Sequence, residues 1–153
     1  MNPWGDLISN KLLWTALLAW LVAQVSKTIL YSIINRRFAV SRLVGSGGMP
    51  SSHAATVCAL TTASAFEYGF QSFQFAVKLI LATIVIYDAR GVRLETGKQA
   101  SVIKSILETL ETENKLVIPK MELQELVGHT PFQVLIGSIL GIAIACLSYL
   151  TPA

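Results

Sequence analysis

Four long apolar segments dominate the pattern of hydrophobic and polar positions along the chain, at residues 12–34, 54–70, 73–87 and 132–150. A helix needs roughly 17 to 25 residues to cross a bilayer, so the first and last segments are long enough. The second is rich in alanine, serine and threonine and the third is short, so both are expected to pack against neighbouring helices. The pattern predicts an all-α integral membrane helical bundle with about four transmembrane helices; two spans are the alternative.

The polar stretch between the third and fourth segments carries a further helical pattern. From Lys98 to about Glu113, apolar residues recur at helical spacing while charged residues occupy the opposite face, which predicts an amphipathic helix on the membrane surface. A second short helix over residues 120–127 would lead to the start of the last span. The chain shows no internal repeat, so residues 1–153 are expected to form a single membrane-embedded domain.

Basic residues distinguish the two sides of the predicted bundle. With four spans, the two long loops, 35–53 and 88–131, lie on one side and both termini lie on the other. Cytoplasmic loops carry an excess of Lys and Arg, so the long loops are expected to face the cytoplasm of a bacterium, with the protein in the inner membrane and both termini outside. The loop side holds Arg36, Arg37, Arg42, Arg90, Arg93, Lys98, Lys104, Lys115 and Lys120, and the other side holds Lys11.

Composition favours a membrane as the solvent and narrows the range of partners. Of the 153 residues, 53% are hydrophobic and 14% are charged, which is more apolar surface than one soluble domain buries. The first segment contains Lys27 and lacks a basic leader, so it is expected to remain in the protein rather than be cleaved as a signal peptide. The chain has no basic run with interleaved aromatic residues, so nucleic acid is not an expected partner. Cys58 and Cys146 lie in apolar segments, where packing is a more common role than a disulfide or a metal site.

The loop before the second span carries candidate chemistry in the stretch GSGGMPSSH, residues 45–53. Glycines let the backbone approach a ligand closely, and the amides of a helix N-terminus attract anions. The candidate phosphate ligands in this cradle are Gly47, Gly48, Ser51 and Ser52. The alternative is a flexible loop that ends in a serine helix cap.

The two histidines occupy equivalent positions, since His53 begins the second span and His129 precedes the last. Both are therefore expected at the same depth on the loop side. A phosphoryl transfer needs a nucleophile, a proton donor and cations for the phosphate oxygens, and Arg90, Arg93 and Lys98 lie in the loop between the histidines. The alternatives are structural interfacial histidines and basic residues placed by membrane topology alone.

Three blocks of sequence carry a family resemblance, and two of them, PSSH and HTPFQVLIG, resemble motifs of the type 2 phosphatidic acid phosphatase and vanadium haloperoxidase superfamily. PSSH at residues 50–53 resembles its PSGH motif, and HTPFQVLIG at 129–137 resembles its HxxxDVxxG motif. Together with YDARGVRLETGKQA at 87–100, these blocks are similar to the GGMPSSH, YDAxGVRxxxGKQA and GHTPxxVxxG blocks of the divergent bacterial and plastid branch.

The resemblance implies a phosphatase that requires no metal or other cofactor, because cationic side chains supply the charge that magnesium supplies elsewhere. His129 would attack phosphorus and form a phosphohistidine, and His53 would protonate the leaving alkoxide. Ser52, the amides of residues 47–48 and Lys27 would hold the phosphate oxygens.

Three features depart from the superfamily pattern. Gln133 stands where the superfamily has an acid four residues after the histidine, and Asp88 or Glu125 is the predicted substitute. The SR dipeptide of the superfamily is missing before His129, and Glu122-Leu123 stands at the corresponding spacing.

In the first motif, Lys27 is followed by Arg36 and Arg37 after a longer gap and without the proline. The lysine itself either points into the site or snorkels to the interface. The predicted replacements for the missing arginine are Arg90 and Arg93.

These features predict a membrane enzyme that hydrolyses a lipid phosphomonoester on the cytoplasmic leaflet. Phosphatidylglycerol phosphate and phosphatidic acid are the first candidate substrates, because lipids made on that leaflet fit the predicted orientation. The alternative, favoured by Gln133, is a non-catalytic protein that binds or translocates lipid phosphates.

Overall fold

The computed structural model describes residues 2–36, 48–112 and 128–151, with the side chains of 92–94 and 111–112 left outside the description. All regular structure in these residues is helical, which confirms the all-α prediction. The predicted short helix at 120–127 lies outside the described residues. The helices are α1 (Pro3–Ile8), α2 (Lys11–Asn35), α3 (Ser52–Tyr68), α4 (Phe73–Arg90), α5 (Val92–Thr112) and α6 (Pro131–Leu150).

Each helix of the bundle begins after a polar residue whose side chain caps it. The side-chain oxygens of Asn10, Ser51, Ser72 and Thr130 accept hydrogen bonds from backbone amides in the first turns of α2, α3, α4 and α6. Such caps satisfy amides that have no partner inside the helix. The boundaries of the four predicted apolar segments lie within a few residues of those of α2, α3, α4 and α6.

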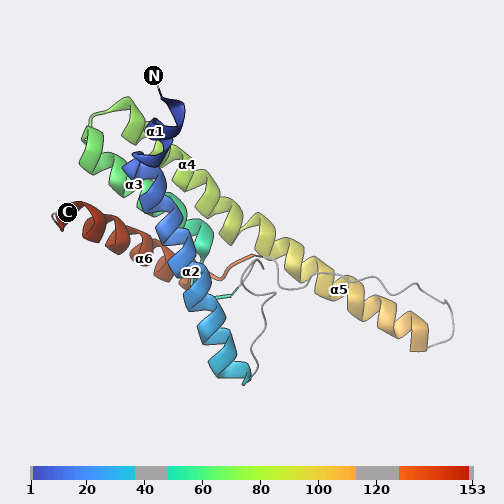
Figure 1. Ribbon diagram of the computed structural model, residues 1–153. Coiled ribbons are helices and arrows are strands. Elements are labelled where there is room, and N and C mark those ends of the chain that lie inside the picture. The colour runs from blue at the N-terminus through green and yellow to red at the C-terminus, as the bar shows by residue number, and fades with distance from the viewer. Residues whose placement is uncertain (1, 37–47, 113–127, 152–153) are drawn as a thin grey trace.

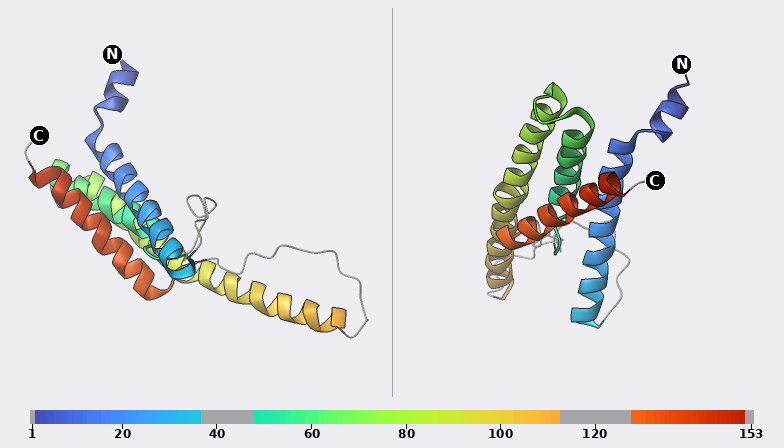
Figure 2. Two further views of the ribbon diagram at one scale, coloured as in Figure 1. Left: turned by 60° about the horizontal axis from the view of Figure 1, so that its bottom comes forward. Right: turned by 90° about the vertical axis from the view of Figure 1, so that its left-hand side faces the viewer.

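The central helix of the bundle is α3, which packs against α2, α4 and α6. Helix α4 runs almost directly into α5 across Gly91, and α5 extends away from the bundle (Figures 1 and 2). Among the described helices α5 contacts α4 alone. Both chain termini lie at the end of the bundle opposite α5 (Figure 1).

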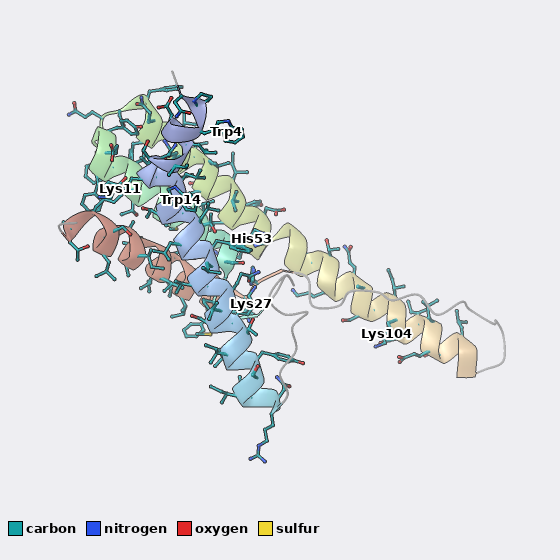
Figure 3. The ribbon with its side chains drawn as sticks, in the orientation of Figure 1. Trp4, Lys11, Trp14, Lys27, His53 and Lys104 are labelled. Atoms are coloured by element: carbon teal, nitrogen blue, oxygen red, sulfur yellow. The ribbon has the colours of Figure 1, made fainter. Side chains whose placement is uncertain are left out.

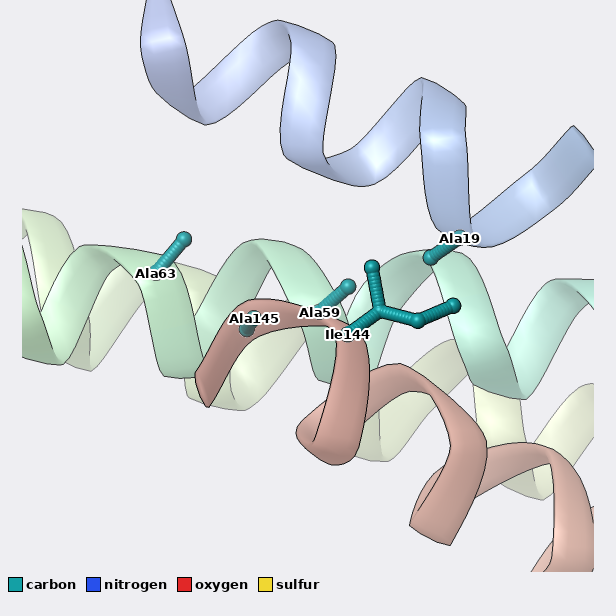
Figure 4. Packing of buried hydrophobic residues seen from close by; sticks show 5 residues of the cluster. All are labelled: Ala19, Ala59, Ala63, Ile144 and Ala145. Atoms are coloured by element: carbon teal, nitrogen blue, oxygen red, sulfur yellow. The ribbon is translucent and has the colours of Figure 1, made fainter. Parts of the chain in front are cut away.

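The centre of the bundle is built from small side chains. Ala19, Ala59, Ala63, Ile144 and Ala145 form its hydrophobic cluster, contributed by α2, α3 and α6 (Figure 4). Large apolar side chains instead point outward, as Leu21, Ile80 and Ile139 do. Small residues let helix backbones approach closely, and an outward-facing apolar surface is stable in lipid. The distribution of side-chain size is thus that of a membrane bundle.

Two of the described helices, α2 and α6, are long and apolar enough to cross a membrane. They contain 25 and 20 residues, whereas α3 and α4 are shorter, with 17 and 18 residues. The number of spans therefore remains a prediction.

The end of the bundle near the termini is held together by aromatic contacts. The Lys11 Nζ of α2 lies 4.2 Å from the centroid of the Tyr149 ring of α6, and that ring stacks on Phe66 of α3 with centroids 5.5 Å apart. Figure 3 shows Lys11 near this end and Lys27 farther along α2. The two lysines of α2 therefore serve different ends of the molecule.

Helices α3 and α6 cross with their backbones in close contact. A Cβ atom added to Gly137 would overlap the carbonyl oxygen of Ser51, and one added to Gly141 would overlap that of Ala55. The backbone amide of Ser51 also donates a hydrogen bond to the carbonyl oxygen of Gln133, with an N···O distance of 3.1 Å. Only glycine at both positions of α6 permits this crossing.

We predict that Gly137→Ala and Gly141→Ala each destabilise the protein, because the methyl group forces α3 and α6 apart. Overpacking of this kind costs about 1 to 3 kcal/mol, which thermal unfolding in detergent would detect as a lower midpoint. Gly5→Ala is the matched control, since a Cβ there makes ordinary contacts with Asn2. Equal midpoints for all three variants would contradict the crossing.

Candidate functional site

The fold brings the two histidines together. His53 is the second residue of α3 and His129 lies just before α6, and their ring centroids are 5.9 Å apart with the planes inclined at 61°. His129 is 1% exposed, while His53 is partly exposed. The ring of His129 is therefore enclosed by the protein, whereas His53 is partly accessible.

Backbone hydrogen bonds fix the position of His129 relative to three helices. Its amide donates to the carbonyl oxygen of Ala89 in the last turn of α4, with an N···O distance of 3.0 Å. The bond from Ser51 to Gln133 ties the start of α3 to the first turn of α6. The end of α4 and the starts of α3 and α6 thus meet at the histidines.

Gln133 orients the ring of His129. Its side-chain oxygen accepts a hydrogen bond from the backbone amide of Thr130 at 3.2 Å. The backbone amide of Gln133 donates in turn to the Thr130 hydroxyl, which completes a capping box. The same oxygen lies 3.4 Å from Nδ1 of His129. Because an amide oxygen is only an acceptor, this contact is a hydrogen bond in the tautomer that carries the proton on Nδ1. The lone pair is then on Nε2.

Lys27 reaches the same place from α2. Its side chain is 3% exposed, and its stem packs on Gly48, where an added Cβ would lie 3.3 Å from Cγ and 3.5 Å from Cδ of the lysine. Gly48 has a φ of 84°, in the left-handed region that favours glycine. Of the two alternatives for Lys27, this geometry favours an inward-pointing side chain over one that snorkels to the interface.

The surroundings of His129 shift its pKa toward the neutral imidazole. Burial lowers the pKa of His129 below its ordinary value of 6.5, and the nearby charges of Lys27 and His53 lower it further. Hydrogen bonding with Gln133 and with the backbone of Gly48 acts in the opposite direction. No carboxylate of the described residues contributes to this balance. A neutral imidazole retains the lone pair that a nucleophile needs.

Two helix N-termini face this region. Helices α3 and α6 begin at Ser52 and Pro131, so that His53 lies in the first turn of α3 and His129 lies two residues before α6. First-turn amides carry partial positive charge and attract anions. Together with Lys27, they make the site electropositive and suited to a phosphate group.

The serines of the predicted cradle differ in their roles. The Ser51 hydroxyl accepts from the Ala54 amide at 3.4 Å and caps α3, so the predicted cap is present. Ser52 is buried in the first turn of α3. The peptide bond between Met49 and Pro50 is cis, and Gly47 lies outside the described residues.

The remaining predicted residues lie on α4 and α5. Asp88 is half-buried in the last turn of α4, next to Ala89, whereas Arg90 is exposed at the end of that helix. Lys98 is exposed on α5 and forms an ion pair with Glu95, with an N···O distance of 2.7 Å. The side chain of Arg93 and the whole of Glu125 lie outside the described residues.

The sequence analysis missed a cavity of about 290 Å³ beside the histidines. It is lined by one face of α2 together with Gly48, Met49 and Gln133. The sequence did contain a signal for this cavity wall. Residues three, four and seven positions after Lys27 lie on the same face of a helix as the lysine. The described α2 residues that line the cavity are Lys27, Leu30, Tyr31, Ile34 and Asn35.

We predict that NMR titration of the labelled imidazoles gives His129 a pKa below 6.5, so that the ring is more than half neutral at pH 6.5. Lys27→Met should raise this pKa, because it removes a nearby positive charge. Lys11→Met, at the other end of α2, should leave it unchanged. A pKa above 6.5 in the unmodified protein, or no response to Lys27→Met, would contradict the proposed surroundings.

Comparison with known proteins places this geometry in a family context. The family model described as "Divergent PAP2 family" matches residues 8–144. The chain is also similar to the "Uncharacterized membrane protein YuiD" of Bacillus subtilis (strain 168), with 40% identity over 146 residues that cover 90% of this chain and 92% of the relative. No solved structure matches the chain. The matched region contains both histidines, Lys27 and Gln133, and the chain is a membrane protein that belongs to the divergent PAP2 family.

Proposed function

We propose that the protein is a lipid-phosphate phosphatase that hydrolyses a phosphomonoester through a phosphohistidine on His129. The observation that carries this proposal is the pairing of His129 with His53 beside the buried Lys27. One ring is held neutral with a lone pair on Nε2, the second can carry a proton, and the lysine supplies positive charge. Membership of a family related to the type 2 phosphatidic acid phosphatases supports the same chemistry.

The first chemical step is an exchange of bonds at phosphorus. Nε2 of His129 forms a bond to phosphorus as the bond from phosphorus to the ester oxygen breaks. His53, in its protonated form, gives its proton to the leaving alkoxide and becomes neutral. In the second step water attacks phosphorus and gives a proton to His53, and the N–P bond breaks to release phosphate. General acid and base catalysis by one residue in this way typically contributes about 10² to 10⁴ in rate.

Positive charge around the phosphate would be supplied by the protein. Lys27 and Gln133, in the first turn of α6, line the space beside the histidines, and His53 lies in the first turn of α3. Fixed charges and dipoles stabilise a transferring phosphoryl group without having to reorganise during the reaction. Arg90, Arg93, Lys98, Ser52 and Gly47 remain candidate ligands from the sequence.

The proposed setting is the cytoplasmic leaflet of a bacterial inner membrane. Four spans, α2, α3, α4 and α6, would place the histidines and α5 on the side with most of the Lys and Arg residues. A lipid phosphate made on that leaflet could reach the site while its tail stays in the bilayer. Phosphatidylglycerol phosphate and phosphatidic acid are the favoured substrates.

The second candidate function is a non-catalytic lipid-phosphate binder or translocator, and Gln133 is the observation that favours it. The glutamine orients His129 but carries no negative charge to stabilise an imidazolium or a phosphohistidine. In serine proteases, exchanging the acid that orients the histidine for its amide lowers the rate about 10⁴-fold. Turnover, rather than binding, distinguishes the two functions.

We expect the purified protein to release phosphate from short-chain phosphatidic acid or phosphatidylglycerol phosphate. His129→Ala should reduce release to background and should prevent the trapping of labelled phosphohistidine. His53→Ala should slow release about 10² to 10⁴-fold through loss of the proton donor. Ser101→Ala, on the exposed surface of α5, is the control and should match the unmodified protein. If the unmodified protein releases no phosphate, the binder is the better account.

The proposed orientation predicts which residues a membrane-impermeant thiol reagent can reach. A cysteine at Thr109, an exposed residue of α5, should react from the cytoplasm, and a cysteine at Asn2 should react from the opposite side. Cys58 and Cys146 would first be replaced by alanine. The reverse labelling pattern in sealed vesicles of known orientation would refute the assignment.

A further inference from the structure

A second cavity, of about 380 Å³, lies between α3, α4 and α6, and neither histidine is among its described lining residues. Helices α4 and α6 both pack along α3 but touch each other at few positions. They diverge toward the end of the bundle that carries the termini (Figure 2). The space between them that α3 bounds is the α4–α6 groove.

The lining of the groove is apolar, and no charged residue is among the described residues that line it. The Thr61 hydroxyl donates to the carbonyl oxygen of Val57 at 2.7 Å, and the Thr83 hydroxyl donates to that of Leu79 at 2.9 Å. Both hydroxyls are therefore already used inside their own helices. Apolar cavities stay free of water, and a polar occupant would lose its own hydrogen bonds there. The surface thus suits a hydrocarbon.

The length of the groove matches one leaflet of a bilayer. Along α4 its lining runs from Phe75 to Ile86, which is about 16 Å at a rise of about 1.5 Å per residue. The hydrocarbon core of a bilayer is about 30 Å thick, so one leaflet contributes about 15 Å. Phe75 lies in the first turn of α4, at the end of the bundle that carries the termini (Figure 1). The groove therefore runs from that interface to about the middle of the bilayer.

The rim of the groove admits a single chain more readily than a helix. Two large side chains that line it, Leu79 of α4 and Ile142 of α6, are 46% and 44% exposed. In a membrane bundle the medium outside them is lipid. Helices pack closely in lipid through small residues, so these side chains would hold off a helix from a second copy. A flexible hydrocarbon chain can pass between them.

We propose that the α4–α6 groove binds one acyl chain of a bilayer lipid from the leaflet on the side of the termini. The inference rests on α3 and α4 crossing the membrane, as proposed above, but not on phosphatase activity. This lipid is not the substrate, because its headgroup lies at the face opposite the histidines. The chain fills the space between α4 and α6 and so braces α4, whose Ala89 carbonyl receives the His129 amide.

Two adjacent residues of α4 allow a matched test. Leu79 lines the groove, whereas Ile80, which is 61% exposed, is not among its described lining residues. Leu79→Trp should fill the groove, and Ile80→Trp adds similar bulk on a different face of α4. Thr83→Phe, with Ile84→Phe as its control, provides a second pair should Leu79→Trp fold poorly.

The probe is phosphatidylcholine with a photoactivatable diazirine on one acyl chain, in vesicles that contain the full chain. This lipid has no phosphomonoester, so it is not a substrate of the proposed reaction. After extraction, washing in detergent and illumination, mass spectrometry locates the cross-linked residues. The unmodified protein should retain the lipid and cross-link it at the groove residues of α3 and α4. Leu79→Trp should lower the yield about tenfold, the loss expected when about two methylene groups are no longer buried. Ile80→Trp should leave the yield unchanged.

Three results would overturn the proposal. The first is cross-linking spread evenly over outward-facing residues such as Leu21 and Ile139, and the second is an equal loss of yield in the two tryptophan variants. The third is a dimer that covers the groove in place of the lipid, which would make a second copy the occupant. Absence of phosphate release in the turnover assay would refute the phosphatase but not the groove, because the cross-linking assay requires no hydrolysis.

Discussion

The close crossing of α3 and α6 is the constraint on which the rest of the structure depends. Gly137 and Gly141 present bare backbone to the carbonyl groups of Ser51 and Ala55, so the two helices touch without intervening side chains. At that distance the Ser51 amide can donate to the carbonyl oxygen of Gln133. The same bond sets the start of α3 against the start of α6. The pairing of His53 with His129 is a consequence of this backbone contact.

The solvent explains why the core is made of small residues. In lipid, burying leucine or isoleucine between helices gains little, because lipid tails are as apolar as the side chains. Close backbone packing and backbone hydrogen bonds such as that from Ser51 to Gln133 hold the helices together instead. Among the described residues, the largest fully buried side chains are therefore His129, Ser51 and Ser64 rather than large aliphatic ones. Polar chemistry can be placed in such a core when each group is held by neighbours.

Gln133 shows how one residue can serve the fold and the site. As the third residue of α6 it completes the capping box with Thr130, and the same amide oxygen faces Nδ1 of His129. A carboxylate there would raise the pKa of the imidazole and favour its charged form. The neutral amide orients the ring and raises its pKa through the hydrogen bond alone, without the charge of a carboxylate, while burial and the charges of Lys27 and His53 oppose protonation. The site thus favours a free lone pair over a stabilised imidazolium.

The sequence by itself determined the helices and the histidine positions, because apolar runs and capping residues act within one segment. The family blocks pointed to the same residues, and comparison confirmed the family. Tertiary structure decided that Lys27 turns inward, that Ala89 receives the His129 amide and that α2 lines a cavity. Each of these depends on how closely two helices approach, which is a property of their packing together and cannot be deduced from either segment alone.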